Sequence, residues 1–193
     1  MSAQPFLITG LPRSRTAWLS VLCTTGNAIC YHEPSICFDD IADLRDFYDK
    51  GTARYIGASD AGLGFFLSWI LENIKPRTLI VDRDVDEVNR SLSRIGLKPK
   101  NSMTLLHREL RKFQSHPLVM WVPFFALERK HIVQKIFSHL MPGEDFDETR
   151  YEHLSSMNIQ VDFAKKVAQI RKHKWPLLWN EHGNANFSDR AVA

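Results

Sequence analysis

The stretch from Phe6 to Leu19 reads FLITGLPRSRTAWL, the pattern of an apolar strand, a tight turn and an amphipathic helix. Its two arginines and two hydroxyl residues are Arg13, Arg15, Ser14 and Thr16. Backbone N–H groups at the start of a helix attract phosphate, and the helix dipole adds to that attraction. The stretch therefore predicts a phosphate-binding loop between the first strand and the first helix.

Strand-like and helix-like segments alternate along the rest of the chain, which is typical of a parallel α/β sheet. The strands are expected at residues 5–9, 28–32, 54–58, 78–82 and 118–122. The helices are expected at residues 15–25, 39–50, 61–73, 84–95, 102–114, 128–140 and 161–174, with a loop-like end from Asn180. The pattern predicts one α/β domain over residues 1–193, with three layers (α/β/α) around a central parallel sheet of about five strands.

Composition and charge narrow the classes of partner. The net charge of +3 favours an anionic small molecule over a nucleic-acid groove, which needs a denser basic stripe. The apolar runs are too short for a membrane span, and the N-terminus lacks the pattern of a secretory signal. Three cysteines, Cys23, Cys30 and Cys37, are an odd number at a spacing that does not suit zinc. We expect reduced, apolar packing residues in a cytoplasmic protein.

The first loop departs from the Walker A pattern G-x-x-x-x-G-K-[ST]. With Gly10 at the first position, the second glycine, the lysine and the metal-binding hydroxyl fall on Arg15, Thr16 and Ala17. Metal-assisted phosphoryl transfer needs that lysine and that hydroxyl. The loop can still hold phosphate, but the sequence disfavours an ATPase or a kinase.

Instead, Pro12-Arg13-Ser14-Arg15-Thr16-Ala17-Trp18 resembles the 5′-phosphosulfate loop of the sulfotransferases, Pro-(Lys/Arg)-Ser-Gly-Thr-(Thr/Ser)-Trp. Arg13 matches the basic position, Ser14 and Thr16 match the hydroxyls, and Trp18 matches the aromatic residue. Arg15 replaces the usual glycine, and Ala17 replaces a hydroxyl. The arginine raises the question of whether the turn stays tight, although a guanidinium can add a charge-assisted contact. Read without the family, the arginines are solvent-facing residues of an ordinary turn.

A second stretch, IVDRDVDEVNRSL from Ile80 to Leu92, strengthens the resemblance. It resembles the family's 3′-phosphate segment, in which a strand-end arginine and a serine on the next helix bind the 3′-phosphate. Arg83 and Ser91 match those positions in type and spacing. Ligands of open α/β sheets collect at the carboxyl ends of the strands, which explains the placement. A capping or ion-pairing role for Arg83 remains the alternative.

The resemblance, to bacterial-type sulfotransferases in particular, implies a P-loop fold and the cofactor 3′-phosphoadenosine 5′-phosphosulfate without a metal. The product would be adenosine 3′,5′-bisphosphate. The implied cofactor-binding residues are Pro12, Arg13, Ser14, Arg15, Thr16, Ala17, Trp18, Arg83 and Ser91.

Sulfuryl transfer needs a group that takes the acceptor's proton and donors that stabilise the leaving phosphate. Some bacterial sulfotransferases have a glutamate after the second strand as the proposed base, which favours Glu33, with His32 as the second candidate. Arg13 would polarise the leaving oxygen. Adjacent strand residues point to opposite faces, so one of the pair His32–Glu33 could simply pack against the sheet.

Other polar and aromatic residues have simpler explanations. Ser59 and Asp60 lie at a strand end, where helix capping or acceptor contact explains them. Trp175 and Trp179 suit core packing or ring stacking. A basic stretch is a solvated helix face or a cover for the nucleotide; it comprises Lys165, Lys166, Arg171, Lys172 and Lys174. His107, His116, His131, His139 and His153 show no metal-ligand spacing.

The sequence favours a sulfotransferase that acts on a hydroxyl or amine of a small-molecule or glycan acceptor. A P-loop small-molecule or nucleotide kinase and a non-catalytic nucleotide-binding module are the alternatives. Neither the acceptor nor the oligomeric state is specified by these motifs, because acceptor pockets are built from variable loops.

Overall fold

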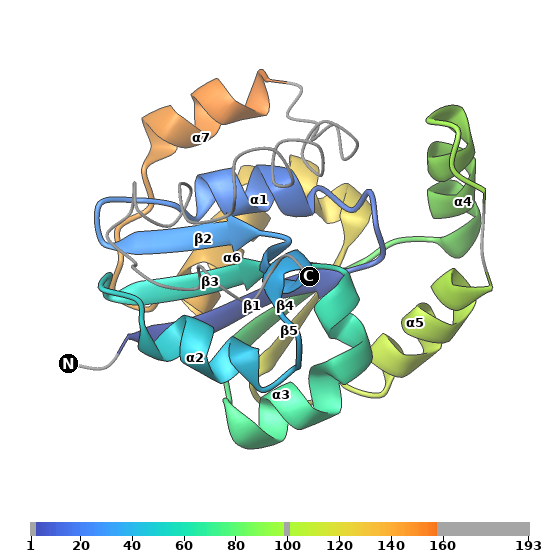
Figure 1. Ribbon diagram of the computed structural model, residues 1–193. Coiled ribbons are helices and arrows are strands. Elements are labelled where there is room, and N and C mark those ends of the chain that lie inside the picture. The colour runs from blue at the N-terminus through green and yellow to red at the C-terminus, as the bar shows by residue number, and fades with distance from the viewer. Residues whose placement is uncertain (1–2, 99–100, 158–193) are drawn as a thin grey trace.

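Five parallel strands form the central sheet of the protein (Figure 1). The structure, a computed structural model, describes residues 3–98 and 101–157. The strand order is β2-β3-β1-β4-β5. The strands are β1 (Gln4–Gly10), β2 (Ala28–His32), β3 (Tyr55–Ser59), β4 (Arg77–Asp82) and β5 (Val119–Pro123). The predicted α/β fold and the five-stranded sheet are confirmed.

The register of the sheet brings the strand ends that matter for function together. β1 lies in the centre, with Ile8 opposite Ser59 of β3 and Gly10 opposite Val81 of β4. Strands buried on both faces are nearly continuous apolar runs, and the middle of β1 and β4 has this character. Because all five strands are parallel, the loops after β1, β2, β3, β4 and β5 meet at one carboxyl edge.

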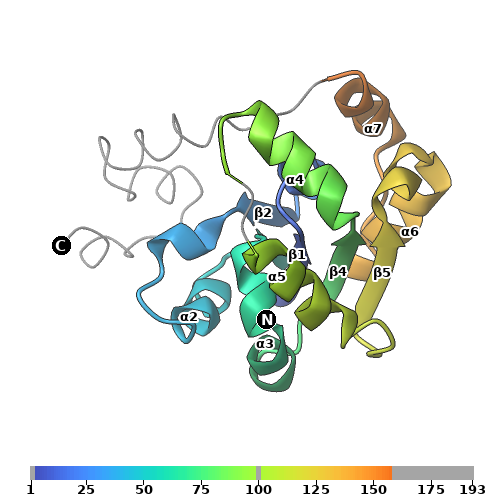
Figure 2. The same cartoon turned by 90° about the vertical axis from the view of Figure 1, so that its right-hand side faces the viewer.

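Helices cover both faces of the sheet (Figures 1 and 2). The helices packed on one face are α1 (Thr16–Leu22), α6 (Lys130–Leu140) and α7 (Glu148–Ser155). Those packed on the other face are α2 (Asp43–Asp49), α3 (Leu67–Asn73), α4 (Val85–Arg94) and α5 (Ser102–Arg111). Three short 3₁₀ helices complete the described part: η1 (Pro34–Cys37), η2 (Gly62–Phe66) and η3 (Phe124–Glu128).

The three cysteines lie in the hydrophobic cores on the two faces of the sheet. Cys23 and Cys30 belong to the core under α1, and Cys37 belongs to the core under α2 and α3. All three are free thiols and buried. Burial raises the pKa of Cys23 to about 12, so this thiol stays protonated and unreactive at neutral pH. The expected role of the cysteines as small packing residues is confirmed.

Several helices differ from the sequence-based prediction; the one expected at residues 15–25, for example, ends at Leu22. The helix expected at residues 39–50 begins at Asp43, because the Asp43 carboxylate accepts the backbone N–H groups of Asp39 and Asp40. The helix expected at residues 61–73 is divided into η2 and α3. Helix α7 was not predicted, and the helix expected at residues 161–174 lies outside the described residues, as do Trp175 and Trp179.

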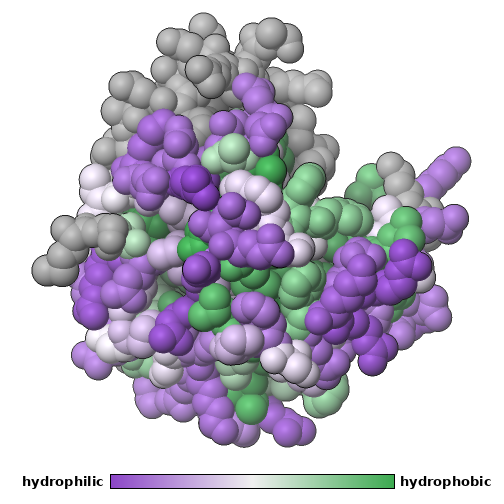
Figure 3. Space-filling view, turned by 90° about the horizontal axis from the view of Figure 1, so that it is seen from below, coloured by the Kyte–Doolittle hydropathy of each residue, from purple (hydrophilic) through white to green (hydrophobic). Residues whose placement is uncertain are grey.

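The surface of the described part carries a few large apolar side chains. Phe65 and Phe66 on η2 and Leu105 on α5 are about half exposed. Figure 3 shows hydrophobic areas among hydrophilic ones on the face seen from below in Figure 1. In residues 3–98 and 101–157, no helix combines the length and the hydropathy that a membrane span requires.

Candidate anion-binding site

The loop after β1 makes a tight turn with two arginines in left-handed backbone conformations. Arg13 has φ 67°, and Arg15, the residue before α1, has φ 59°. Glycine adopts this conformation freely, whereas a residue with a Cβ atom pays about 1–2 kcal/mol. The turn expected at this position therefore forms with Arg15 in the glycine's place, and the chain carries the strain of that substitution.

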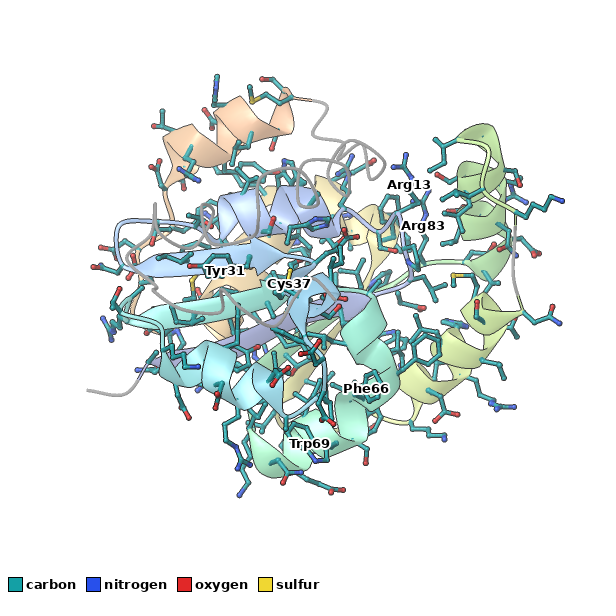
Figure 4. All side chains as sticks on the ribbon, viewed as in Figure 1. Arg13, Tyr31, Cys37, Phe66, Trp69 and Arg83 are labelled. Carbon is teal, nitrogen blue, oxygen red and sulfur yellow. The ribbon has the colours of Figure 1, made fainter. Side chains whose placement is uncertain are left out.

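The two sequence motifs meet at the carboxyl edge of the sheet. The Arg83 guanidinium, which follows β4, donates a hydrogen bond through Nη1 to the backbone carbonyl oxygen of Arg13. Arg13 in turn donates through Nε to Oγ of Ser91 on α4, at 3.2 Å. Arg13 and Arg83 lie side by side between the loop and α4 (Figure 4). The structure therefore brings together Arg13, Arg83 and Ser91, which the sequence placed in separate motifs.

A phenylalanine that the sequence did not single out lies under two of the arginines. The Arg83 guanidinium carbon is 4.0 Å from the centre of the Phe124 ring, and that of Arg15 is 5.7 Å from the same ring. Phe124 directly follows β5, so it shares the carboxyl edge with the other loops. The sequence marks Phe124 as a candidate only by its place directly after a strand. The exposed Phe125 beside it has the same place, so this feature does not distinguish the two.

The loop's hydroxyl and aromatic residues occupy different environments. Ser14 is fully buried, and its Oγ has no hydrogen-bond partner among the described residues. A buried hydroxyl without a partner costs about 1–3 kcal/mol of folding stability. A ligand that forms a hydrogen bond with Ser14 Oγ would offset that cost. Trp18 is buried in the core instead, where its indole N–H donates to the carbonyl oxygen of Leu154 in α7 at 3.0 Å. Trp18 therefore fixes the position of α1.

His32 and Glu33 lie together beside the loop. Nε2 of His32 is 3.4 Å from Oγ1 of Thr16, and Nδ1 of His32 is 3.8 Å from Oε2 of Glu33. Strand alternation alone would separate two neighbours onto opposite faces. Glu33 leaves the strand with φ 53°, and this left-handed turn brings its carboxylate to the side of the imidazole. Both candidate bases therefore belong to one cluster next to Thr16.

Ser59 and Asp60 organise the backbone at the end of β3. Ser59 donates through Oγ to the carbonyl oxygen of Thr16 at 2.8 Å. The buried Asp60 carboxylate accepts the backbone N–H groups of Ser35 at 3.1 Å and Gly62 at 2.7 Å. These contacts support the capping interpretation of Asp60 and tie the loop after β2 to the start of η2.

Backbone strain gathers at this edge of the molecule. In residues 3–98 and 101–157, four non-glycine residues have positive φ: Arg13, Arg15, Glu33 and Lys75. The first three belong to the candidate site, and Lys75 ends α3 at the opposite edge of the sheet. Residues in such conformations cluster at ligand-binding and catalytic sites, since function offsets their cost.

The described histidines do not form a metal centre. His107 pairs with Asp82 at 2.9 Å, and His139 donates through Nε2 to the carbonyl oxygen of Thr78 at 3.2 Å. Within the described ranges, no group of three or more His, Cys, Asp or Glu side chains could hold a metal ion.

Together the sheet order and the turn after β1 define an α/β protein with a P-loop fold, and the convergent arginines make the loop a candidate anion-binding site. Its fold is that of the sulfotransferases. A sulfotransferase from Alicyclobacillus acidocaldarius is 10% identical and superimposes with a TM-score of 0.54 over 96% of this chain and 98% of that one. Mouse sulfotransferase SULT7A1 complexed with PAP is 10% identical, with a TM-score of 0.56 over 98% of this chain and 73% of that one. No protein-family model and no curated protein matches the sequence. The resemblance inferred from the motifs is thus confirmed for the fold.

Proposed function

We propose that the protein is a sulfotransferase, which moves a sulfuryl group from 3′-phosphoadenosine 5′-phosphosulfate to a hydroxyl or amine of a small-molecule or glycan acceptor. The observation that carries the proposal is the convergence of Arg13, Arg83 and Ser91 through two hydrogen bonds. The similarity in fold to a sulfotransferase complexed with PAP supports it. The odd number of free, buried cysteines supports the further proposal of a cytoplasmic location.

The residues of the loop suit a donor with phosphates at two positions. In the proposal, residues 12–17 bind the 5′-phosphosulfate, Trp18 supports them from the core, and Arg83 and Ser91 bind the 3′-phosphate. The partnerless Ser14 hydroxyl and the excess of guanidinium groups at this edge fit such an anion. The bound donor supplies an activated sulfuryl group, and no metal ligand is required of the chain.

Two side chains have proposed chemical roles in the transfer. Glu33 accepts the proton of the acceptor's hydroxyl or amine, and its position beside His32 and Thr16 places it next to the loop. Arg13 stabilises the negative charge that develops on the leaving phosphate oxygen. His32 is the second candidate for the base.

The test is calorimetric titration with adenosine 3′,5′-bisphosphate in the absence of Mg²⁺. The wild type should bind it, and Arg83→Ala should weaken this ligand far more than 5′-AMP, which lacks the 3′-phosphate. A matched control is Arg111→Ala, an exposed arginine on α5, which should change neither affinity. An absence of binding to the wild type would overturn the proposal. Mg²⁺-dependent ATP turnover would indicate a kinase, and binding without transfer to a broad acceptor panel a binding module.

A further inference from the structure

An arginine, Arg15, stands in the place of a glycine in the loop after β1. Arg15 is exposed, yet its guanidinium lies over the same aromatic ring as that of Arg83. The two guanidinium carbons are therefore separated by no more than the sum of their distances to the Phe124 ring. Both positive charges lie at one edge of the site, and an anion bound there would be attracted to each of them.

Acidic side chains neutralise this pair only in part. The structure gives Arg15 no ion pair with an acidic residue in the described part of the chain. Arg83 contacts the half-exposed carboxylate of Glu87, with Nε 3.4 Å from Oε2. The face of Phe124 attracts both cations, because the ring quadrupole is negative there, and this attraction helps to position both guanidinium groups.

Backbone strain at Arg15 points in the same direction. The position needs a left-handed conformation, in which glycine is the residue without a steric penalty. An arginine there weakens the local structure unless its side chain contributes elsewhere. A contribution to folding is not evident, because the side chain makes no capping hydrogen bond and is exposed.

We propose that Arg15 is a donor-binding residue, and that Phe124 is the positioning residue that holds Arg15 and Arg83 toward the phosphates of one nucleoside bisphosphate. This inference rests on the proposed function, which already includes Arg15 among the loop residues; it assigns a direct role to the Arg15 guanidinium and a positioning role to Phe124. For Arg15 the ring supplies the rigidity that an acidic partner would give, and it leaves the positive charge of Arg15 available to the ligand.

The decisive variant is Arg15→Gly, because strain and binding predict opposite effects. The glycine relieves the left-handed strain, so the variant should unfold at the same temperature as the wild type or higher. Its affinity for adenosine 3′,5′-bisphosphate should nevertheless fall about tenfold to a hundredfold, as expected for the loss of a charged hydrogen bond. Lys75→Gly is the matched control, since it relieves the same strain at an exposed position distant from the loop and should leave the affinity unchanged.

Phe124→Leu tests the ring. Leucine keeps apolar volume but has no π face, so the affinity should fall about twofold to fivefold, the equivalent of an exposed cation–π contact. Phe125→Leu, at the neighbouring exposed phenylalanine, should have no effect. The dependence of the affinity on salt should become shallower in Arg15→Gly, because one fewer cation meets the ligand, whereas Lys75→Gly should keep the wild-type slope.

The outcomes separate this inference from the proposed function. If the wild type binds adenosine 3′,5′-bisphosphate and Arg15→Gly binds it equally well, the inference is overturned and the function stands. If the wild type does not bind it, the function is overturned. Inorganic pyrophosphate, titrated in parallel, then decides the inference: weaker binding by Arg15→Gly than by the wild type supports an Arg15 anion site, and equal or absent binding excludes it.

Discussion

Arg13 in the loop after β1 donates a hydrogen bond through Nε to Oγ of Ser91 on α4, although 78 positions separate the two residues in the sequence. Arg83 closes the arrangement by donating to the carbonyl oxygen of Arg13. The loop and α4 are thus joined by side chains that both suit phosphate. These contacts already hold the side chains in position before a ligand bridges the loop and α4. The entropic cost of ordering the site on binding is therefore lower.

Ser91→Ala tests this connection. The variant loses the partner of Arg13 Nε and one hydroxyl for the donor, so affinity for adenosine 3′,5′-bisphosphate should fall about tenfold, within the range for a hydrogen bond to a charged group. The free energy of unfolding should fall by about 1 kcal/mol or less. Calorimetry and urea unfolding measure the two quantities. Ser93→Ala on the same helix is the control, since Ser93 is exposed and donates only to the carbonyl oxygen of Asn89 within α4; equal losses in both variants would contradict the prediction.

Glu33→Gln separates chemistry from binding. The amide keeps the shape of the side chain but does not accept the acceptor's proton at neutral pH, so the rate constant for sulfuryl transfer should fall about 10²- to 10⁴-fold. The affinity for adenosine 3′,5′-bisphosphate should stay within about twofold of the wild type. Single-turnover transfer assays and calorimetry provide the measurements. The reverse pattern, in which His32→Gln abolishes transfer and Glu33→Gln retains it, would assign the base to His32.

The sheet and the meeting of the two motifs could be predicted from sequence, because both depend on local patterns. The apolar runs of β1 and β4 mark buried strands, and Arg83 and Ser91 follow one of them at a fixed spacing. Because the strands are parallel, these residues must lie at the same carboxyl edge of the sheet as the first loop. The strand at residues 28–32 was predicted with the boundaries that the structure has.

The cluster of His32 and Glu33 and the position of Phe124 were beyond such patterns. The φ of 53° at Glu33 overrides strand alternation, and a backbone angle at a non-glycine residue leaves no mark in the sequence. Phe124 meets Arg83 and Arg15 across the sheet edge, a long-range contact between three loops. Two adjacent phenylalanines follow β5, and local sequence does not tell which of them faces the arginines.

Helix α7 shows how a weak apolar pattern hides an element. Tyr151 and Leu154 are its two buried residues, so the helical repeat is a single pair. Its start carried a better signal, since the Asp147 carboxylate accepts the backbone N–H of Arg150 as an N-terminal cap. The helix matters to the site indirectly, because it receives the indole N–H of Trp18.

Gly10→Ala should damage both the fold and the site. A Cβ atom at this position would lie 2.5 Å from the backbone carbonyl oxygen of Val81, and a backbone atom of the paired strand β4 cannot move away easily. We expect a loss of about 1–3 kcal/mol in the free energy of unfolding, as for overpacked cores. Donor affinity should fall as well, because β1 and β4 carry the loop and Arg83. Gly26→Ala, with no atom within 4 Å of the added methyl group, should change the stability by less than about 0.5 kcal/mol.

His139 makes the stability of the fold depend on pH. Burial lowers the pKa of this imidazole below its usual value of 6.5, because the charged form loses hydration in the packing between α6 and the sheet. The unfolded chain then binds the proton more tightly than the folded one. The stabilisation is complete above the unfolded pKa and is lost as the pH falls through that value toward the folded pKa.

Urea unfolding at about pH 7.5 and about pH 5.5, on either side of the ordinary histidine pKa, should therefore show a larger loss of stability in the wild type than in His139→Gln. The glutamine can keep a donor for the carbonyl oxygen of Thr78 without titrating. His131→Gln, at an exposed position of the same helix, should retain the wild-type pH dependence. If His139→Gln also retained it, the protonation that destabilises the fold would belong to another group, and the prediction for His139 would be wrong.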